Sequence, residues 1–538
     1  MLVSDLSLEQ KIGQMFICGF HAQEPDEQIR RLIEEYHVGG VIYFRRNIGE
    51  PEQVAAMSSS LQELAAKQGN LPLWIAIDQE GGMVARIDHR RVSRIPGNMS
   101  LGATGNPDFT YRVSAISAQE LHALGINMNF APVLDVNNNP RNPVIGVRSF
   151  GEDPEQVAEH GSAAIRAYQE HGVSAAAKHF PGHGDTSVDS HLGLASVEHG
   201  MERLREVELK PFVRAIRDGV DVIMTAHVVF PAIEKEAVPA TLSKAVLTGL
   251  LRGQLGYEGV IVTDCLEMHA IAKHFGVGEG AVLAVEAGAD IVLVSHTLQD
   301  QIEAVEAVTA AVRSGRIPES VIDAAVSRVL KLKEKRLQPS GTQESAPAFL
   351  ERHEKPETER LLREVAAGSI TLVKNDGQLP LQEDEPVLVV WPELRSETQV
   401  DEPWTEAKTL GQALSEYIQD VNELTISAEP DLHEVEQVLA AAQGYRQVVV
   451  ATYTAGSELP AGQRRLVEGL IALQPQRLVV ASTRNPYDLA AVPASPAYLC
   501  CYENTPYFME GLASILTGHA KAGGTLPVSL GSQTTASQ

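Results

Sequence analysis

Short apolar runs alternate with amphipathic segments through the first 300 residues. The runs are nearly continuous and rich in β-branched residues, as expected for strands that are buried on both faces. They cover residues 14–20, 39–44, 73–80, 126–136, 173–180, 221–229, 259–265 and 290–296. The segments between them, such as 25–37, 51–68 and 153–172, have helical periodicity, and several begin with Pro or Asp. Strands that alternate with helices in this way predict an α/β fold, a parallel (β/α)8 TIM-type barrel.

A second unit follows the barrel. A helical pattern at 318–337 is followed by QPSGTQESAPA at 338–348, which has the composition of a linker. Further apolar runs then appear at 369–375, 386–391, 447–452, 477–483 and 497–503. We therefore predict a barrel over residues 1–337, a linker over 338–360 and a C-terminal α/β sandwich domain over 361–538.

Charge and composition limit the class of partner. The chain has 44 Lys and Arg against 70 Asp and Glu, a net charge of −26, which argues against nucleic acid and anionic membranes as partners. The N-terminus has neither a basic n-region nor an apolar h-region. The four cysteines form no CxxC motif, so we interpret them as buried free thiols of a reducing compartment. We expect a cytoplasmic protein, or a secreted one if a leader has been removed.

Ionisable residues follow most of the predicted barrel strands. A strand that is buried on both faces has no structural reason to end in a charge, and active sites of such barrels lie at the carboxyl ends of the strands. Many ionisable groups at one buried mouth would cost desolvation energy, which favours a functional explanation. The residues at the strand ends are Asp78, Glu80, Asp135, Lys178, His179, His227, Asp264 and His296.

The segment KHFPGHGDTSVDSHLGL at 178–194 is the richest in candidate chemistry. It could be a solvated surface loop, or it could bind a metal through His179, His183, Asp185 and His191. We expect no metal, because barrel metallohydrolases usually carry an HxH motif at strand one and this chain has none. A third possibility is acid/base chemistry. In an extended Asp189-Ser190-His191 segment the first and third side chains share one side, and a carboxylate raises the pKa of an imidazole.

Five motifs give the barrel a resemblance to glycoside hydrolase family 3. The loop with the Asp-Ser-His triplet is similar to the bacterial N-acetyl-β-glucosaminidase branch of that family, and GSITLVKNDGQLPL (368–381) resembles the start of its second, α/β sandwich domain. The five motifs are IDQEGGMVAR (77–86), FAPVLDV (130–136), VRSFGEDP (147–154), KHFPGHGDTSVDSH (178–191) and TDCLEM (263–268).

The resemblance implies specific roles. Asp264 matches the family's nucleophile, His191 the acid/base of this branch and Asp189 its dyad partner. No residue of the second domain is assigned a role, and no cofactor is implied. The residues that match the sugar-binding groups are Asp78, Arg86, Arg148, Lys178 and His179.

The resemblance also implies a reaction. We expect a retaining exo-β-N-acetylglucosaminidase that acts on GlcNAc-MurNAc or anhydro-MurNAc fragments of the cell wall through a glycosyl-aspartate. A histidine does not repel an anionic acceptor, which leaves transfer to phosphate open. The alternatives are a chitin-oligosaccharide N-acetylglucosaminidase, a β-glucosidase of the same family, a metal-dependent amidohydrolase and a carbohydrate-binding protein on an inactive barrel.

Overall fold

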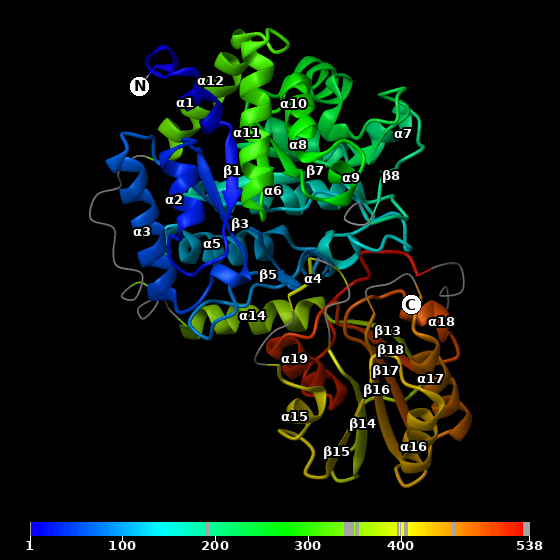
Figure 1. Cartoon of the computed structure of the whole chain (residues 1–538). Coiled ribbons are helices and arrows are strands. Elements are labelled where there is room, and N and C mark those ends of the chain that lie inside the picture. Colours follow the sequence, from blue (N-terminus) through cyan, green and yellow to red (C-terminus); the bar gives the residue numbers. More distant parts are fainter. Residues whose placement is uncertain are drawn as a thin grey trace.

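The computed structural model describes residues 2–189, 193–337, 349, 355–394, 398, 400–402, 407–454 and 458–530. Its N-terminal part is a closed parallel barrel with the strand order β1-β12-β11-β9-β7-β6-β3-β2 (Figure 1). Every barrel strand falls inside one of the eight predicted runs, so the barrel is confirmed. The strands are β1 (Phe16–Gly19), β2 (Gly40–Tyr43), β3 (Trp74–Ile77), β6 (Met128–Asn129), β7 (Ser174–Phe180), β9 (Val222–Thr225), β11 (Val260–Cys265) and β12 (Ile291–Val294).

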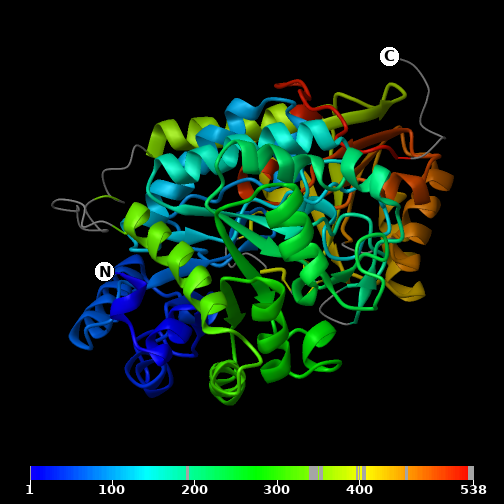
Figure 2. The same cartoon turned by 90° about the horizontal axis from the view of Figure 1, so that it is seen from above.

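Helices surround these strands (Figure 2). The capping pattern expected from the sequence is present in α6, where Pro154 opens the helix and the Asp153 side chain accepts the N–H of Glu155. In the described part of the chain no helix is long and apolar enough to span a bilayer. The helices are α1 (Leu8–Gln14), α2 (Glu27–Glu34), α3 (Pro51–Lys67), α4 (Asn98–Ala103), α5 (Pro107–Ala123), α6 (Pro154–Glu170), α7 (Met201–Glu206), α8 (Lys210–Arg217), α9 (His269–Ala272), α10 (Val277–Ala287), α11 (Leu298–Arg313), α12 (Glu319–Arg336) and the π-helical segment η5 (Ala245–Gln254).

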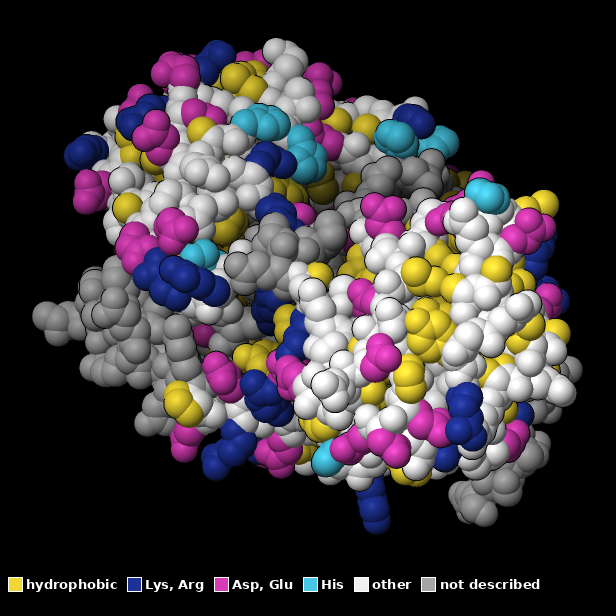
Figure 3. All heavy atoms as spheres, turned by 90° about the horizontal axis from the view of Figure 1, so that it is seen from below, with side chains coloured by type: hydrophobic (Ala, Val, Ile, Leu, Met, Phe, Trp, Pro, Cys, Tyr) yellow, Lys and Arg dark blue, Asp and Glu magenta, His cyan; other side chains and the backbone are white. Residues whose placement is uncertain are grey.

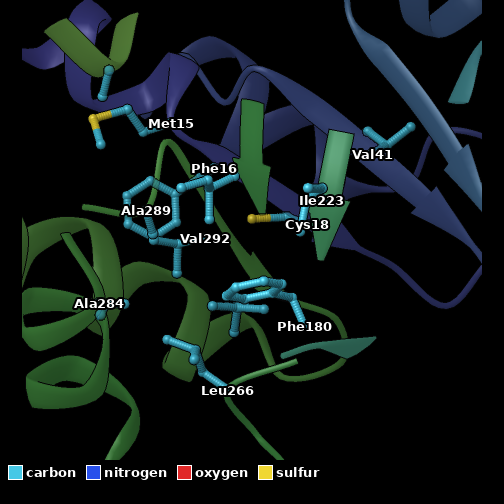
Figure 4. Close-up of a cluster of buried hydrophobic side chains, with 14 of the residues drawn as sticks. Met15, Phe16, Cys18, Val41, Phe180, Ile223, Leu266, Ala284, Ala289 and Val292 are labelled. Atoms are coloured by element: carbon cyan, nitrogen blue, oxygen red, sulfur yellow. The ribbon is translucent and has the colours of Figure 1, made fainter. Parts of the chain in front are cut away.

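Alternate residues of each barrel strand enter different cores. In β1, Phe16 and Cys18 pack outward against the helices, in the cluster drawn in Figure 4. Ile17, between them, points into the barrel with Trp74 and Val262. This alternation explains why most positions of the strands are apolar on both faces. All four cysteines are buried free thiols, as predicted.

The C-terminal domain is built on a six-stranded sheet with the order β13-β18-β17-β16-β14-β15. Five strands match the predicted runs. The edge strand β15 is not among them because only its last residue is buried, so it forms no continuous apolar run. All neighbours are parallel except β13 and β18. The strands are β13 (Thr371–Asn375), β14 (Val387–Pro392), β15 (Val421–Ile426), β16 (Gln447–Thr452), β17 (Arg477–Ser482) and β18 (Ala497–Cys500).

Helices cover both faces of this sheet, which confirms the α/β sandwich (Figure 1). Val448 and Val450 of β16 pack in one apolar layer, whereas Val449 and Ala451 pack in the other. One layer holds α16 (Leu432–Ala442), α17 (Ala461–Leu473) and α18 (Asp488–Ala491), and the other holds α14 (Lys355–Ser369), α15 (Leu410–Leu414) and α19 (Pro506–Leu516).

The two domains share an interface. Helix α14 packs against α4 and α5 of the barrel and against α19 of the second domain. It begins at Lys355, so the last part of the expected linker is helical, whereas residues 338–348 lie outside the described residues. On the face seen in Figure 3, acidic and basic side chains are intermixed, and the net negative charge is not gathered into one patch there.

Candidate active site

A cavity of about 320 Å³ opens where the barrel strands end. It collects residues from the carboxyl ends of β7 and β11 and residues that follow β3 and β12, so the predicted convergence of strand ends is confirmed for most of them. Asp135 and His227 lie outside this lining. The ionisable residues that line the cavity are Asp78, Glu80, Arg86, Arg148, Lys178, His179, Asp264, Cys265, Glu267, His269, His296 and Glu402.

A network of four charges forms the floor of the cavity. The Lys178 ammonium lies 2.7 Å from a carboxylate oxygen of Asp78 and 2.7 Å from one of Glu80. Arg148 donates two hydrogen bonds to Glu80, at 2.7 and 2.9 Å. Burial alone would raise the pKa of Glu80, but Arg148 and Lys178 hold it well below its usual range. Burial opposes the charge of Lys178, but Asp78 and Glu80 raise its pKa. Glu80, Arg148 and Lys178 are therefore ionised at neutral pH.

Short elements around β3 position this network. Glu80 lies on β4 (Gln79–Gly81), which forms a hairpin with β5 (Val84–Ala85), and Arg86 comes directly after β5. Arg148 ends the 3-10 turn η3 (Gly146–Arg148). Because the turn and the hairpin meet at Glu80, residues that are far apart in the sequence are held in one rigid group.

His179 is held by a buried carboxylate. Its Nδ1 lies 2.7 Å from Asp135, which also accepts the backbone N–H groups of His179 and His183. Burial would raise the pKa of Asp135, but the neighbouring His179 lowers it. The ionised Asp135 fixes the orientation of the His179 ring at the end of β7. Asp135 thus supports a site residue and does not line the cavity itself.

Asp264 stands at the end of β11 and is partly exposed to the cavity. Its Oδ1 accepts the backbone N–H of Cys265 at 2.7 Å. Asp78, Lys178, His179 and Asp264, which the sequence placed on three different strands, therefore line one cavity. Lys178 and Arg148 form their ion pairs with Asp78 and Glu80.

Of the expected acid/base pair, Asp189 and His191, the structure describes only Asp189. Asp189 is buried, and its carbonyl accepts the N–H of Gly193 at 3.0 Å. His191 lies outside the described residues. The pairing of Asp189 with His191 thus stays a prediction.

The metal site considered for the loop after β7 does not assemble from its described residues. His183 is buried and hydrogen-bonded to Thr186, and burial lowers its pKa to about 4. Asp185 contacts the ring of His199. Among the described residues, the two groups with ligand atoms close enough to share an ion are Asp185, His199 and Glu208, and Cys265, Glu267 and His296. Neither group contains His179 or His183.

One strand-end histidine has a structural explanation. His227 is completely buried, and its two ring nitrogens contact the Thr241 hydroxyl at 2.8 Å and the Cys265 carbonyl at 2.9 Å. It links the segment after β9 to the end of β11 and does not line the cavity.

The C-terminal domain also contributes to the cavity, which the sequence did not predict. Val400 and Glu402, from the segment after β14, line it. Glu402 accepts a hydrogen bond from Arg86 at 2.9 Å, and its other oxygen lies 3.4 Å from Arg45. The Val400 carbonyl accepts a second hydrogen bond from Arg86 at 3.1 Å. A loop with no periodic pattern gives no sign in the sequence that it reaches another domain.

Comparisons with known proteins agree with this architecture. Models of the N-terminal and C-terminal domains of glycosyl hydrolase family 3 match residues 7–332 and 370–537. The chain is 34% identical to a β-hexosaminidase A of Pseudoalteromonas piscicida over 94% of the chain and 91% of that protein. It is 29% identical to a β-N-acetylglucosaminidase/β-glucosidase of Cellulomonas fimi over 98% and 94%. The solved structure of a family 3 β-N-acetylglucosaminidase from Paenibacillus superposes with a TM-score of 0.92 at 50% identity, covering 98% of this chain and 99% of that one.

Proposed function

The chain belongs to glycoside hydrolase family 3 and is a glycosidase, and we propose that it is a retaining exo-β-N-acetylglucosaminidase. The observation that carries this proposal is the placement of Asp264 in a cavity with Asp78, Lys178 and His179. The names of the similar proteins from Pseudoalteromonas and Paenibacillus support N-acetylglucosamine as the sugar. The cavity volume of about 320 Å³ is at the low end for ligand pockets, which suits one sugar unit at a chain end.

Asp264 is the proposed nucleophile. A retaining glycosidase needs a carboxylate on one face of the sugar and a proton donor on the other. Asp264 stands on a strand end, and the Cys265 N–H holds one of its oxygens, which orients the carboxylate in the cavity for attack on the anomeric carbon. The glycosidic oxygen leaves with a proton, and a covalent glycosyl-aspartate forms. Water then attacks that ester with the help of a base, and the product keeps the β configuration.

His191 is the proposed acid and base, with Asp189 as its partner. A loop histidine can approach the leaving oxygen and withdraw for product release. Asp78, Arg86, Arg148, Lys178 and His179 are the proposed sugar-binding groups. Lys178 and Arg148 are buried, and their charges are balanced by Asp78 and Glu80, so they hold fixed positions for sugar hydroxyl groups.

The proposed substrates are GlcNAc-MurNAc and GlcNAc-anhydro-MurNAc fragments of the cell wall, with chitin oligosaccharides as the alternative. The uncharged or cationic histidine also permits inorganic phosphate to take the place of water. We also propose a cytoplasmic location for the protein. The proposed domain boundaries are those predicted from the sequence, a barrel over residues 1–337, a linker over 338–360 and a C-terminal domain over 361–538.

The test compares GlcNAc-anhydro-MurNAc with chitobiose, each with and without inorganic phosphate, and follows the products by NMR. We expect β-GlcNAc as the first product and faster turnover of the cell-wall disaccharide. GlcNAc-1-phosphate in the phosphate samples would identify a phosphorylase. Faster turnover of chitobiose would favour the chitin alternative. An α-configured first product would exclude the retaining mechanism, and the Asp264→Asn variant serves as the inactive control.

One observation favours a second candidate. A family 3 β-glucosidase would take its acid/base glutamate from the second domain, and Glu402 of that domain lines the cavity. Both oxygens of Glu402 face arginine side chains, however, which is typical of an ionic anchor and not of a proton donor. Turnover of a glucoside in place of the N-acetylglucosaminide would support this candidate.

A further inference from the structure

Three different metal-ligating side chains meet on one wall of the cavity. Cys265 ends β11, Glu267 follows two residues later, and His296 comes after the neighbouring strand β12. One ligand atom of each, the thiol sulfur, a carboxylate oxygen and a ring nitrogen, lies within 4.8 Å of the other two. The Cys265 sulfur is 3.7 Å from Oε2 of Glu267. The proposed glycosidase mechanism uses none of these three side chains.

The backbone holds this group in place. Glu267 accepts the N–H groups of Ser295 and His296 at 2.7 Å each, and that of Thr297 at 2.8 Å. These contacts tie the segment after β11 to the segment after β12. The Ser295 side chain is completely buried on the same wall, and its hydroxyl has no hydrogen-bond partner among the described residues. The three ligands therefore lie on a rigid scaffold beside a buried polar group whose bonding is incomplete.

The ligand types indicate which ion fits. A thiolate, an imidazole and a carboxylate are the usual ligands of Zn²⁺, whereas Mg²⁺ and Ca²⁺ take oxygen ligands. When metal binding releases the thiol proton to solvent, the Cys265 thiolate and the Glu267 carboxylate supply two negative charges for one dication. Arg46 contacts His296 Nδ1 at 3.2 Å, but it also donates to the Phe20 and Ser295 carbonyls at 2.8 and 3.0 Å. It thus keeps its place whichever ring nitrogen binds the ion.

We propose that Cys265, Glu267 and His296 form a binding site for a thiophilic divalent cation of the Zn²⁺ class, and that this ion inhibits the enzyme. The inhibition, but not the binding, rests on the proposed function. Cys265 is the residue next to Asp264, and its N–H holds the Asp264 carboxylate. A cation on the Cys265 sulfur attracts that carboxylate away from the anomeric carbon and fills the wall of the sugar cavity.

The binding test uses the full chain, freed of metal, with Co²⁺ as a spectroscopic probe. We expect one equivalent of Co²⁺ to give a thiolate-to-metal charge-transfer band, which Zn²⁺ abolishes by displacement. Cys265→Ser should lose the band and weaken Zn²⁺ binding by about 100-fold, and His296→Gln should weaken it by at least about 10-fold. His199→Gln, in the other group of possible ligands, is the matched control and should bind as the unaltered chain does.

The outcomes separate the claims. If the unaltered chain gives no thiolate band, the proposed site is wrong. The site is also wrong if Cys265→Ser and His296→Gln bind Zn²⁺ as the unaltered chain does, whereas His199→Gln does not bind it. For inhibition, Zn²⁺ should suppress turnover of a chromogenic N-acetylglucosaminide at the concentration that displaces Co²⁺, and EDTA should restore it. Binding without inhibition overturns the inhibitory role alone. A protein that binds Zn²⁺ at this site but never hydrolyses the N-acetylglucosaminide contradicts the proposed function and supports the binding site.

Discussion

Glu80 is the residue on which the charge balance of the cavity floor depends. It is buried and pairs with both Arg148 and Lys178. Glu80→Gln would leave two buried cations with one fewer carboxylate, and the loss of one partner of a buried ion pair typically costs about 3–5 kcal/mol. We expect a decrease of that order in the free energy of unfolding, measured by denaturation. Glu35→Gln, which breaks an exposed pair with Arg31, is the control and should have no measurable effect. If both variants lose the same stability, the network does not support the fold.

Asp264 and His191 are predicted to fail in different ways. Asp264 must bond to the sugar whatever the leaving group is, so Asp264→Asn should be nearly inactive on every substrate. His191 protonates the departing oxygen, a task worth about 10²–10⁴ in rate. His191→Ala should therefore slow cleavage of a natural disaccharide far more than cleavage of a dinitrophenyl glycoside.

Rescue by azide is a second test of the role of His191. Without its base, His191→Ala should accumulate the covalent intermediate on the dinitrophenyl substrate, and azide should release it as β-glycosyl azide. Asp189→Ala should show a milder form of the same defect, because the imidazole stays but is less well oriented. Equal losses of His191→Ala on both substrates, with no effect of azide, would mean that this loop does not supply the acid/base.

At the scale of elements, the segment after β14 connects the domains through Glu402. The neighbouring Asp401 is buried and forms two hydrogen bonds with Arg484, at 2.8 and 3.0 Å, which anchor the segment to the second domain. The N–H of Glu402 donates to the Met83 carbonyl in the β4–β5 hairpin at 3.0 Å. Glu402 is thus a rigid support for Arg86, one of the proposed sugar-binding groups.

Loss of this support should weaken substrate binding. In Glu402→Gln, Arg86 loses the nearer of two ionic partners and keeps Asp78 at 3.8 Å. The loss of a charged hydrogen bond of about 1.4 kcal/mol corresponds to a tenfold change. We expect KM to rise about tenfold with little change in kcat, on natural and dinitrophenyl substrates alike. Glu393→Gln, an exposed residue of the same segment, should leave both constants unchanged. A loss of kcat confined to the natural substrate and rescued by azide would instead identify Glu402 as the acid/base.

The strands and the site differ in how far the sequence could predict them. Barrel strands such as β12 are apolar throughout because helices and the barrel interior cover both faces, so their runs stand out. The edge strand β15 has only one buried position at its end and shows no such run. Asp78 and Asp264 were predictable because a charge ends an apolar strand. Glu402 was not, because its position depends on how two domains pack, and no local pattern records that contact.

At the scale of the whole molecule, Glu503 of the C-terminal domain is buried against the barrel. It accepts the N–H of Gly97 at 2.9 Å and the hydroxyl of Ser100 at 2.6 Å, so it caps the start of α4. Asn98, in the first turn of α4, donates to the Arg148 carbonyl at 2.7 Å. The domain interface is thereby linked to the cavity through one helix.

This buried carboxylate makes the stability of the two-domain assembly depend on pH. Burial raises the pKa of Glu503 to about 7 in the folded protein, above the value of about 4.3 expected in an unfolded chain. The folded state therefore favours the protonated acid. The stabilisation is fully present below about pH 4 and is lost as the pH rises through about 7, by up to about 4 kcal/mol. Glu503→Gln imitates the protonated form, so the Tm of this variant should exceed the Tm of the unaltered chain by an amount that grows from about pH 5 to pH 8.

The control is Glu364→Gln, at an exposed residue of α14, and its Tm should not diverge from that of the unaltered chain over this range. A Tm difference for Glu503→Gln that stays constant over this range would mean that Glu503 does not titrate at the interface.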